Sequence, residues 1–123
     1  MTTALIIEDN EDNRVSMTIL LENSGYKVIE AETGETGCQM AADEQPDFIL
    51  LDIQLPDIEG TEVLRRLRAN DATQEIPVIA VTSYAMAGDR HRLLSAGCNG
   101  YIEKPIDPVH IISQIQAILG ESQ

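Results

Sequence analysis

A short apolar run near the middle of the chain decides the fold: residues 47–56 read DFILLDIQLP. Residues 48–51 are all apolar, and Asp52 ends the run. A short, continuously apolar run is typical of a strand that is buried on both faces, as the strands of a parallel sheet are. We therefore predict a strand over residues 47–52, with Asp52 at its carboxyl end.

Similar runs, with helical patterns between them, continue this arrangement along the chain. The other strands are predicted over residues 4–8, 27–31, 77–82 and 100–103, which are apolar and rich in β-branched residues. Helices are predicted over residues 12–24, 34–43, 61–70, 86–96 and 108–119. This alternation favours a doubly wound α/β fold: a five-stranded parallel sheet with five helices on its two faces, joined by right-handed crossovers.

The last helix carries the clearest signals. Its apolar residues fall on one stripe, which consists of Ile111, Ile112, Ile115, Ile118 and Leu119. We expect Asp107 to be its N-cap, Pro108 to stand in its first turn and Gly120 to close it.

Composition limits the classes of function that the chain can have. Its 123 residues, 43% of them hydrophobic and 24% charged, are expected to form one domain over residues 1–123. A formal net charge of −13 disfavours binding to nucleic acids and to anionic membranes. We see no membrane span and no signal peptide, and we expect Cys38 and Cys98 to be free thiols. A cytoplasmic location is therefore predicted.

Polar residues stand where the predicted strands end. The first strand leads into Glu8 and Asp9, the third ends at Asp52, the fourth ends at Thr82, and the fifth leads to Lys104. Ligands of an open parallel sheet bind outside the carboxyl ends of its strands. Crowded carboxylates repel one another, and Mg²⁺ prefers carboxylates together with water and phosphate oxygens. This pattern predicts a magnesium site at which Asp52 serves as the nucleophile of a phosphoryl transfer.

Other residues offer weaker signals. His91 and His110 lie in predicted helices away from the strand ends, so we interpret them as solvated or packing residues. The acidic stretch over residues 8–13 suggests a calcium loop, but the glycine and the glutamate that such a loop needs are missing.

Four motifs carry a resemblance to a known family. They are the sequences IIEDN (6–10), DFILLDIQLP (47–56, followed by Gly60), IAVTS (79–83) and GYIEKP (100–105). Across essentially its whole length the chain resembles the receiver domains of two-component response regulators. Residues 82–89 and 96–98 look most like DivK-type stand-alone receivers and the receivers of hybrid kinases. The resemblance implies a flavodoxin-like, CheY-like sheet with the strand order 2-1-3-4-5.

The resemblance also implies roles for individual residues, each matched to a motif of this sequence. Asp52 would be the phosphoacceptor, and Mg²⁺, for which Mn²⁺ is an alternative, would be bound by Asp9, Asp52, the backbone carbonyl of Gln54 and, through a water molecule, Glu8. Thr82 and Lys104 would contact the phosphoryl group, Tyr101 would turn inward as a switch, and the peptide bond before Pro105 would be cis. Gln54 and Tyr84 would border the path of an attacking water molecule and tune hydrolysis.

Implied partners are proteins. The phosphoryl group would come from a phosphohistidine of a sensor histidine kinase or a histidine phosphotransfer protein. Phosphorylation would change the affinity of the face formed by the fourth helix, the fifth strand and the fifth helix for an effector protein. The chain would be a monomer or a weak, phosphorylation-dependent homodimer. It would not be an enzyme, apart from self-phosphorylation and slow autodephosphorylation.

Several alternatives compete with this interpretation. A flavodoxin-like cofactor binder is disfavoured because the acidic loop over residues 9–13 would repel a phosphate. A phosphatase or phosphotransferase that acts on an external substrate is disfavoured because no second acid and no cap are evident. A phosphate-independent receiver that only binds proteins stays open, as does a receiver excised from a hybrid histidine kinase.

Overall fold

The computed structural model describes residues 2–83 and 87–120, and these contain a single parallel sheet of five strands. The order across the sheet is β2-β1-β3-β4-β5, which confirms the predicted fold class and strand order. The strands are β1 (Thr3–Ile7), β2 (Lys27–Ala31), β3 (Phe48–Asp52), β4 (Val78–Thr82) and β5 (Gly100–Glu103). Pairing places Leu51 of β3 opposite Ile7 of β1 and Ala80 of β4, so the carboxyl ends of the three central strands meet at one edge.

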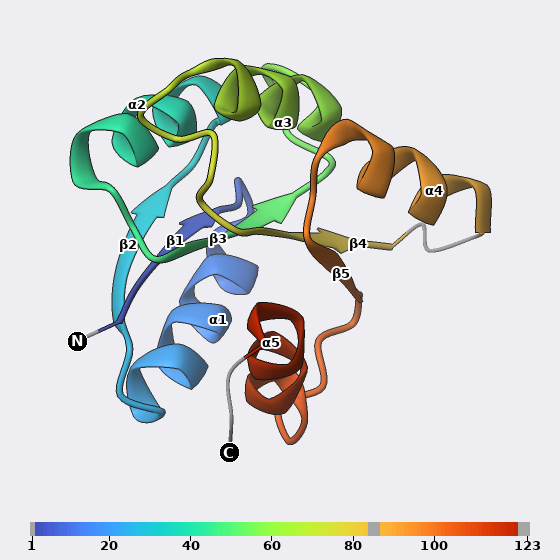
Figure 1. Cartoon of the computed structure of the whole chain (residues 1–123). Coiled ribbons are helices and arrows are strands. Elements are labelled where there is room, and N and C mark those ends of the chain that lie inside the picture. The colour runs from blue at the N-terminus through green and yellow to red at the C-terminus, as the bar shows by residue number, and fades with distance from the viewer. Residues whose placement is uncertain (1, 84–86, 121–123) are drawn as a thin grey trace.

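Helices cover both faces of this sheet (Figure 1). They are α1 (Glu11–Asn23), α2 (Gly34–Glu44), α3 (Gly60–Ala69), α4 (Ala87–Ala96) and α5 (Ile111–Leu119). α1 and α5 lie side by side on one face, and α2 and α3 lie on the other. α4 adds Leu93 to the core beneath α2 and α3.

Two hydrophobic cores explain why β3 is continuously apolar up to Asp52. Along β3, Ile49 and Leu51 belong to the core beneath α2, α3 and α4. Phe48 and Leu50 belong to the core beneath α1 and α5. All four side chains are at most 1% exposed, because successive residues of a strand point to opposite faces and both faces here are covered.

The structure corrects the start of the last helix. α5 begins at Ile111, not at residue 108, because residues 108–110 form a turn before it. Asp107 is therefore not the N-cap of α5; its Oδ1 accepts the Val109 N–H in that turn, at 2.9 Å. The apolar stripe itself begins at Ile111, which is buried. Gly120 closes α5 in the left-handed conformation, as predicted.

No helix within residues 2–83 and 87–120 has both the length and the apolar character that crossing a membrane requires.

Candidate metal and phosphoryl-acceptor site

Three carboxylates meet at the carboxyl edge of the sheet. Glu8 and Asp9 follow β1, Asp52 ends β3, and one oxygen of each lies within 4.8 Å of the others. Glu8 is completely buried and Asp52 is 5% exposed, whereas Asp9 is exposed. They meet because Ile7 and Leu51 are paired across β1 and β3, so the residues that follow them leave the sheet together.

Lys104 supplies positive charge to this cluster. Its Nζ lies 3.4 Å from Asp52 Oδ1 and 3.6 Å from Glu8 Oε1. The Lys104 N–H donates to the carbonyl of Thr82 at 2.8 Å, which attaches the loop after β5 to the end of β4. The peptide bond between Lys104 and Pro105 is cis. Lys104 thus brings one positive charge to a cluster of three carboxylates.

Glu8 is the most perturbed group of the cluster. Burial raises the pKa of Glu8 to about 7, and the neighbouring Asp52 carboxylate adds to this rise. Asn13 Nδ2 donates to Glu8 Oε1 at 2.9 Å, and this bond and Lys104 both act to lower the pKa. The other oxygen, Oε2, is buried and accepts no hydrogen bond within the described part of the chain.

These features fit a divalent cation. A buried carboxylate oxygen without a donor, close to two further carboxylates, calls for a positive charge in the site. Hard oxygen ligands are those that Mg²⁺ prefers, and Mg²⁺ normally keeps several waters beside one or two carboxylates. Glu8, Asp9 and Asp52 are therefore the residues that would hold Mg²⁺, which would neutralise the cluster and bind phosphate oxygens.

Asp52 is oriented by the backbone that follows it. The Gln54 N–H donates to Asp52 Oδ1 at 3.0 Å, and the Gln54 side chain is exposed. Oδ1 is thus the oxygen held by the main chain and by Lys104. At the end of β4, Thr82 is 2% exposed and follows Val81, the residue paired with Asp52.

Tyr101 lies on β5, with its side chain half-buried. The Arg90 guanidinium of α4 is 4.9 Å from the centre of its ring, and Arg90 Nη2 lies 2.9 Å from Glu103 Oε1.

Tyr84 falls outside the described residues. His110, which lies just before α5, is exposed and its Nδ1 pairs with Asp107 Oδ2 at 2.6 Å.

Two residues near the cluster were not found from the sequence. Asn13 contacts the Glu8 side chain, and the buried Arg14 donates through Nη1 to the carbonyls of Glu8 at 3.0 Å and Asp9 at 3.5 Å. Arg14 also pairs with Glu30 at 2.9 Å, which ties the loop after β1 to β2. Both residues stand in the polar stretch that opens α1, where nothing in the pattern separates them from solvated neighbours.

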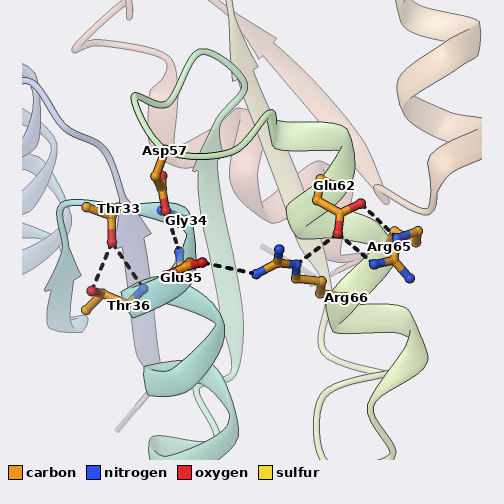
Figure 2. Close-up of polar contacts among 8 residues, drawn as sticks. All are labelled: Thr33, Gly34, Glu35, Thr36, Asp57, Glu62, Arg65 and Arg66. Atoms are coloured by element: carbon orange, nitrogen blue, oxygen red, sulfur yellow. Dashed lines mark hydrogen bonds and ion pairs between the residues drawn. The ribbon is translucent and has the colours of Figure 1, made fainter.

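The loop that follows Asp52 is anchored to α2 (Figure 2). Asp57 Oδ1 and Oδ2 accept the N–H groups of Gly34 and Glu35, at 2.9 and 3.0 Å. Glu35 in turn lies 3.8 Å from Arg66 of α3, as Figure 2 shows. The loop is therefore held by the N-terminus of a helix, where donors are free to bind a carboxylate.

A groove of about 710 Å³ borders the site. One wall is α1, which contributes Met17 and Leu20, and the other is the segment between β5 and α5, which contributes Pro105 and Ile106. Lys104 lines this groove and also contacts Asp52, so the groove and the carboxylate cluster are continuous.

Comparison with known proteins agrees with this geometry. Residues 4–116 match the family model of the response regulator receiver domain. The chain is 42% identical over 120 residues to the polar-differentiation response regulator DivK of Brucella anthropi, and the alignment covers 98% of both chains.

Solved structures give the same picture. A putative response regulator from Chloroflexus aurantiacus aligns with a TM-score of 0.90 and 28% identity over 98% of both chains. The receiver domain of sensor histidine kinase PA1611 from Pseudomonas aeruginosa PAO1 aligns with a TM-score of 0.88 and 32% identity over 98% of both chains. That structure has a magnesium ion coordinated in its active site cleft.

Proposed function

The chain belongs to the response regulator receiver domain family, and we propose that it accepts a phosphoryl group from a phosphohistidine onto Asp52 in the presence of Mg²⁺. The observation that carries the proposal is the cluster itself. Three carboxylate oxygens lie within 4.8 Å of one another, and Lys104 Nζ lies 3.4 Å from Asp52. Such a cluster suits the transfer of a charged group, which needs opposite charges already in place.

The proposed transfer is a single displacement. An oxygen of Asp52 bonds to phosphorus while the bond from phosphorus to the imidazole nitrogen of the donor breaks, and that nitrogen keeps the electron pair. Lys104 pairs with an oxygen of the incoming group, and the Thr82 hydroxyl donates to another. When bound, Mg²⁺ supplies positive charge for the phosphoryl oxygens.

We assign the metal ligands in the same proposal. Asp9, Asp52 and the carbonyl of Gln54 would bind the ion directly, and Glu8 would act through a water molecule. This assignment agrees with the burial of the residues, because Glu8 lies at the bottom of the cluster and Asp9 at its exposed side. Mn²⁺, which also takes oxygen ligands, would substitute for Mg²⁺.

Phosphorylation would then be reported as a change in protein affinity. We propose that Thr82 moves toward the phosphoryl group and that Tyr101 turns inward, so that the face formed by α4, β5 and α5 binds an effector protein differently. Gln54 and Tyr84 would tune the slow hydrolysis that resets the site. This makes the chain a signalling domain without turnover of an external substrate.

The groove beside Lys104 is the proposed contact for the phosphodonor, a sensor histidine kinase or a histidine phosphotransfer protein. A donor must bring its histidine to Asp52, and the groove is continuous with that site through Lys104. Ile19 of α1 also lines this groove, and its side chain is 52% exposed. We place the chain in the cytoplasm, where Cys38 and Cys98 would stay the free thiols that they are in the structure.

The proposal is tested by intact-mass spectrometry after incubation with acetyl phosphate, with Mg²⁺ or with excess chelator. We expect one phosphoryl adduct on the wild type with Mg²⁺ and none with chelator or on Asp52→Asn. Asp47→Asn is the matched control, because Asp47 precedes the opposite end of β3, and it should take up the group. An adduct on Asp52→Asn would overturn the assignment of the acceptor. No adduct on the wild type, from acetyl phosphate or from a phosphorylated histidine donor, would favour a phosphate-independent binding module.

A further inference from the structure

We propose that Asn13 is a positioning residue of the magnesium site, acting through Glu8. It donates a hydrogen bond to Glu8 Oε1 at 2.9 Å and thereby leaves Oε2 as the oxygen offered to the ion or to a water molecule bound to it. This inference rests on the proposed function, because it concerns the metal that the phosphoryl transfer requires.

The first support is the hydrogen bonding of Glu8. Its side chain is completely buried, and within residues 2–83 and 87–120 Asn13 is its hydrogen-bond donor. Lys104 approaches Oε1 too, but at 3.6 Å it makes an ionic contact and not a hydrogen bond. A carboxylate held at one oxygen cannot rotate without breaking that bond, so its second oxygen keeps one direction.

The second support is that Asn13 is itself held in place. Its N–H donates to the side chain of Asn10, which caps α1, at 2.9 Å. The next residue, Arg14, donates to the carbonyl of Glu8 at 3.0 Å. α1 therefore contacts Glu8 at two points, the carboxylate through Asn13 and the main chain through Arg14.

The third support is that, among the described residues, the Asn13 side chain donates its hydrogen bond to Glu8 and is not packed in the core. Its side chain is exposed, and alanine is a better helix former than asparagine. Replacement by alanine removes a donor from the buried Glu8 carboxylate, and the higher helix propensity of alanine offsets part of that cost, so we expect the variant to stay folded. A loss of metal affinity in that variant would come from the site and not from unfolding.

The test is a titration of the protein with MgCl₂, followed by the amide resonances in two-dimensional NMR. We expect Asn13→Ala to weaken the apparent Kd for Mg²⁺ about tenfold, as is typical when a group that orients a metal ligand is removed. Asn13→Ser, whose side chain is too short to reach Glu8, should weaken it similarly. Asn23→Ala, the same change at the far end of α1, should change it by less than about twofold. Urea unfolding midpoints measured beside the titrations show that every variant is folded.

A double-mutant cycle separates an effect through Glu8 from a general one. In a Glu8→Gln background, Asn13→Ala should weaken Mg²⁺ binding by less than about twofold. Equal affinities of Asn13→Ala and the wild type would overturn this inference and leave the proposed function standing. A wild type that binds no Mg²⁺ would overturn both.

Discussion

The raised pKa of Glu8 makes the stability of the fold depend on pH. Its pKa is about 7 in the folded chain and 4.5 as an ordinary glutamate. Between these values the folded chain holds a proton that the unfolded chain has released. The contribution of Glu8 to stability is therefore fully present below about pH 4.5 and is lost as the pH rises through about 7.

We predict that the free energy of unfolding, measured with urea in the presence of chelator, falls between pH 5 and pH 8. The part due to Glu8 is on the order of 3 kcal/mol at most, since one pKa unit corresponds to about 1.4 kcal/mol. Glu8→Gln carries no charge at any pH and should show a flatter profile. If the two profiles ran parallel, Glu8 would not be the group that titrates in this window.

At the level of secondary structure, Arg14 of α1 connects its helix to two other parts of the fold. These are β2 and the loop that follows β1. Its side chain is 9% exposed, and it pairs with Glu30 at 2.9 Å and Glu32 at 3.1 Å in addition to the two carbonyls. Removal of a largely buried arginine leaves these carbonyls without their donor, which is costly. We predict that Arg14→Ala lowers the free energy of unfolding by about 2 kcal/mol or more, as measured with urea.

The control for Arg14 is Arg65, whose ion pair with Glu62 lies within α3 and whose side chain is 67% exposed. Exposed pairs of this kind contribute little, so Arg65→Ala should leave the unfolding midpoint nearly unchanged. Equal losses from the two substitutions would show that the buried contacts of Arg14 contribute no more to stability than an exposed ion pair does.

Arg90 connects α4 to β5 through the Tyr101 ring and Glu103. These are the elements of the proposed output face, so their connection should influence how easily that face rearranges. We predict that Arg90→Ala speeds amide hydrogen exchange in α4 and β5 and leaves exchange in α1 unchanged. Unchanged exchange in α4 would mean that other contacts hold this helix in place.

At the scale of the whole molecule, the strands and the gathering of residues at their ends were predictable. Short, continuously apolar runs indicate buried strands, and the resemblance to receiver domains implies their order. Glu8, Asp9, Asp52 and Lys104 could therefore be placed together before the structure was known. These residues could be placed together because the carboxyl ends of the strands in a parallel sheet all lie at one edge.

The residues that support the cluster could not be predicted in the same way. Asn13, Arg14 and Asp57 act through specific side-chain hydrogen bonds, which leave no periodic pattern in the sequence. The start of α5 was misplaced for a related reason. Asp107 and Pro108 are typical of a helix start, and here they shape a turn that precedes the helix.

The proposed function depends above all on Asp52 as the residue that receives the phosphoryl group. Borohydride reduces an aspartyl phosphate to homoserine, so peptide mass spectrometry after phosphorylation with Mg²⁺ and reduction marks the acceptor by its position. We expect homoserine at position 52 and at no other aspartate, and none when chelator replaces Mg²⁺. Homoserine at position 9, or a phosphorylated protein in which Asp52 stays unreduced, would contradict it.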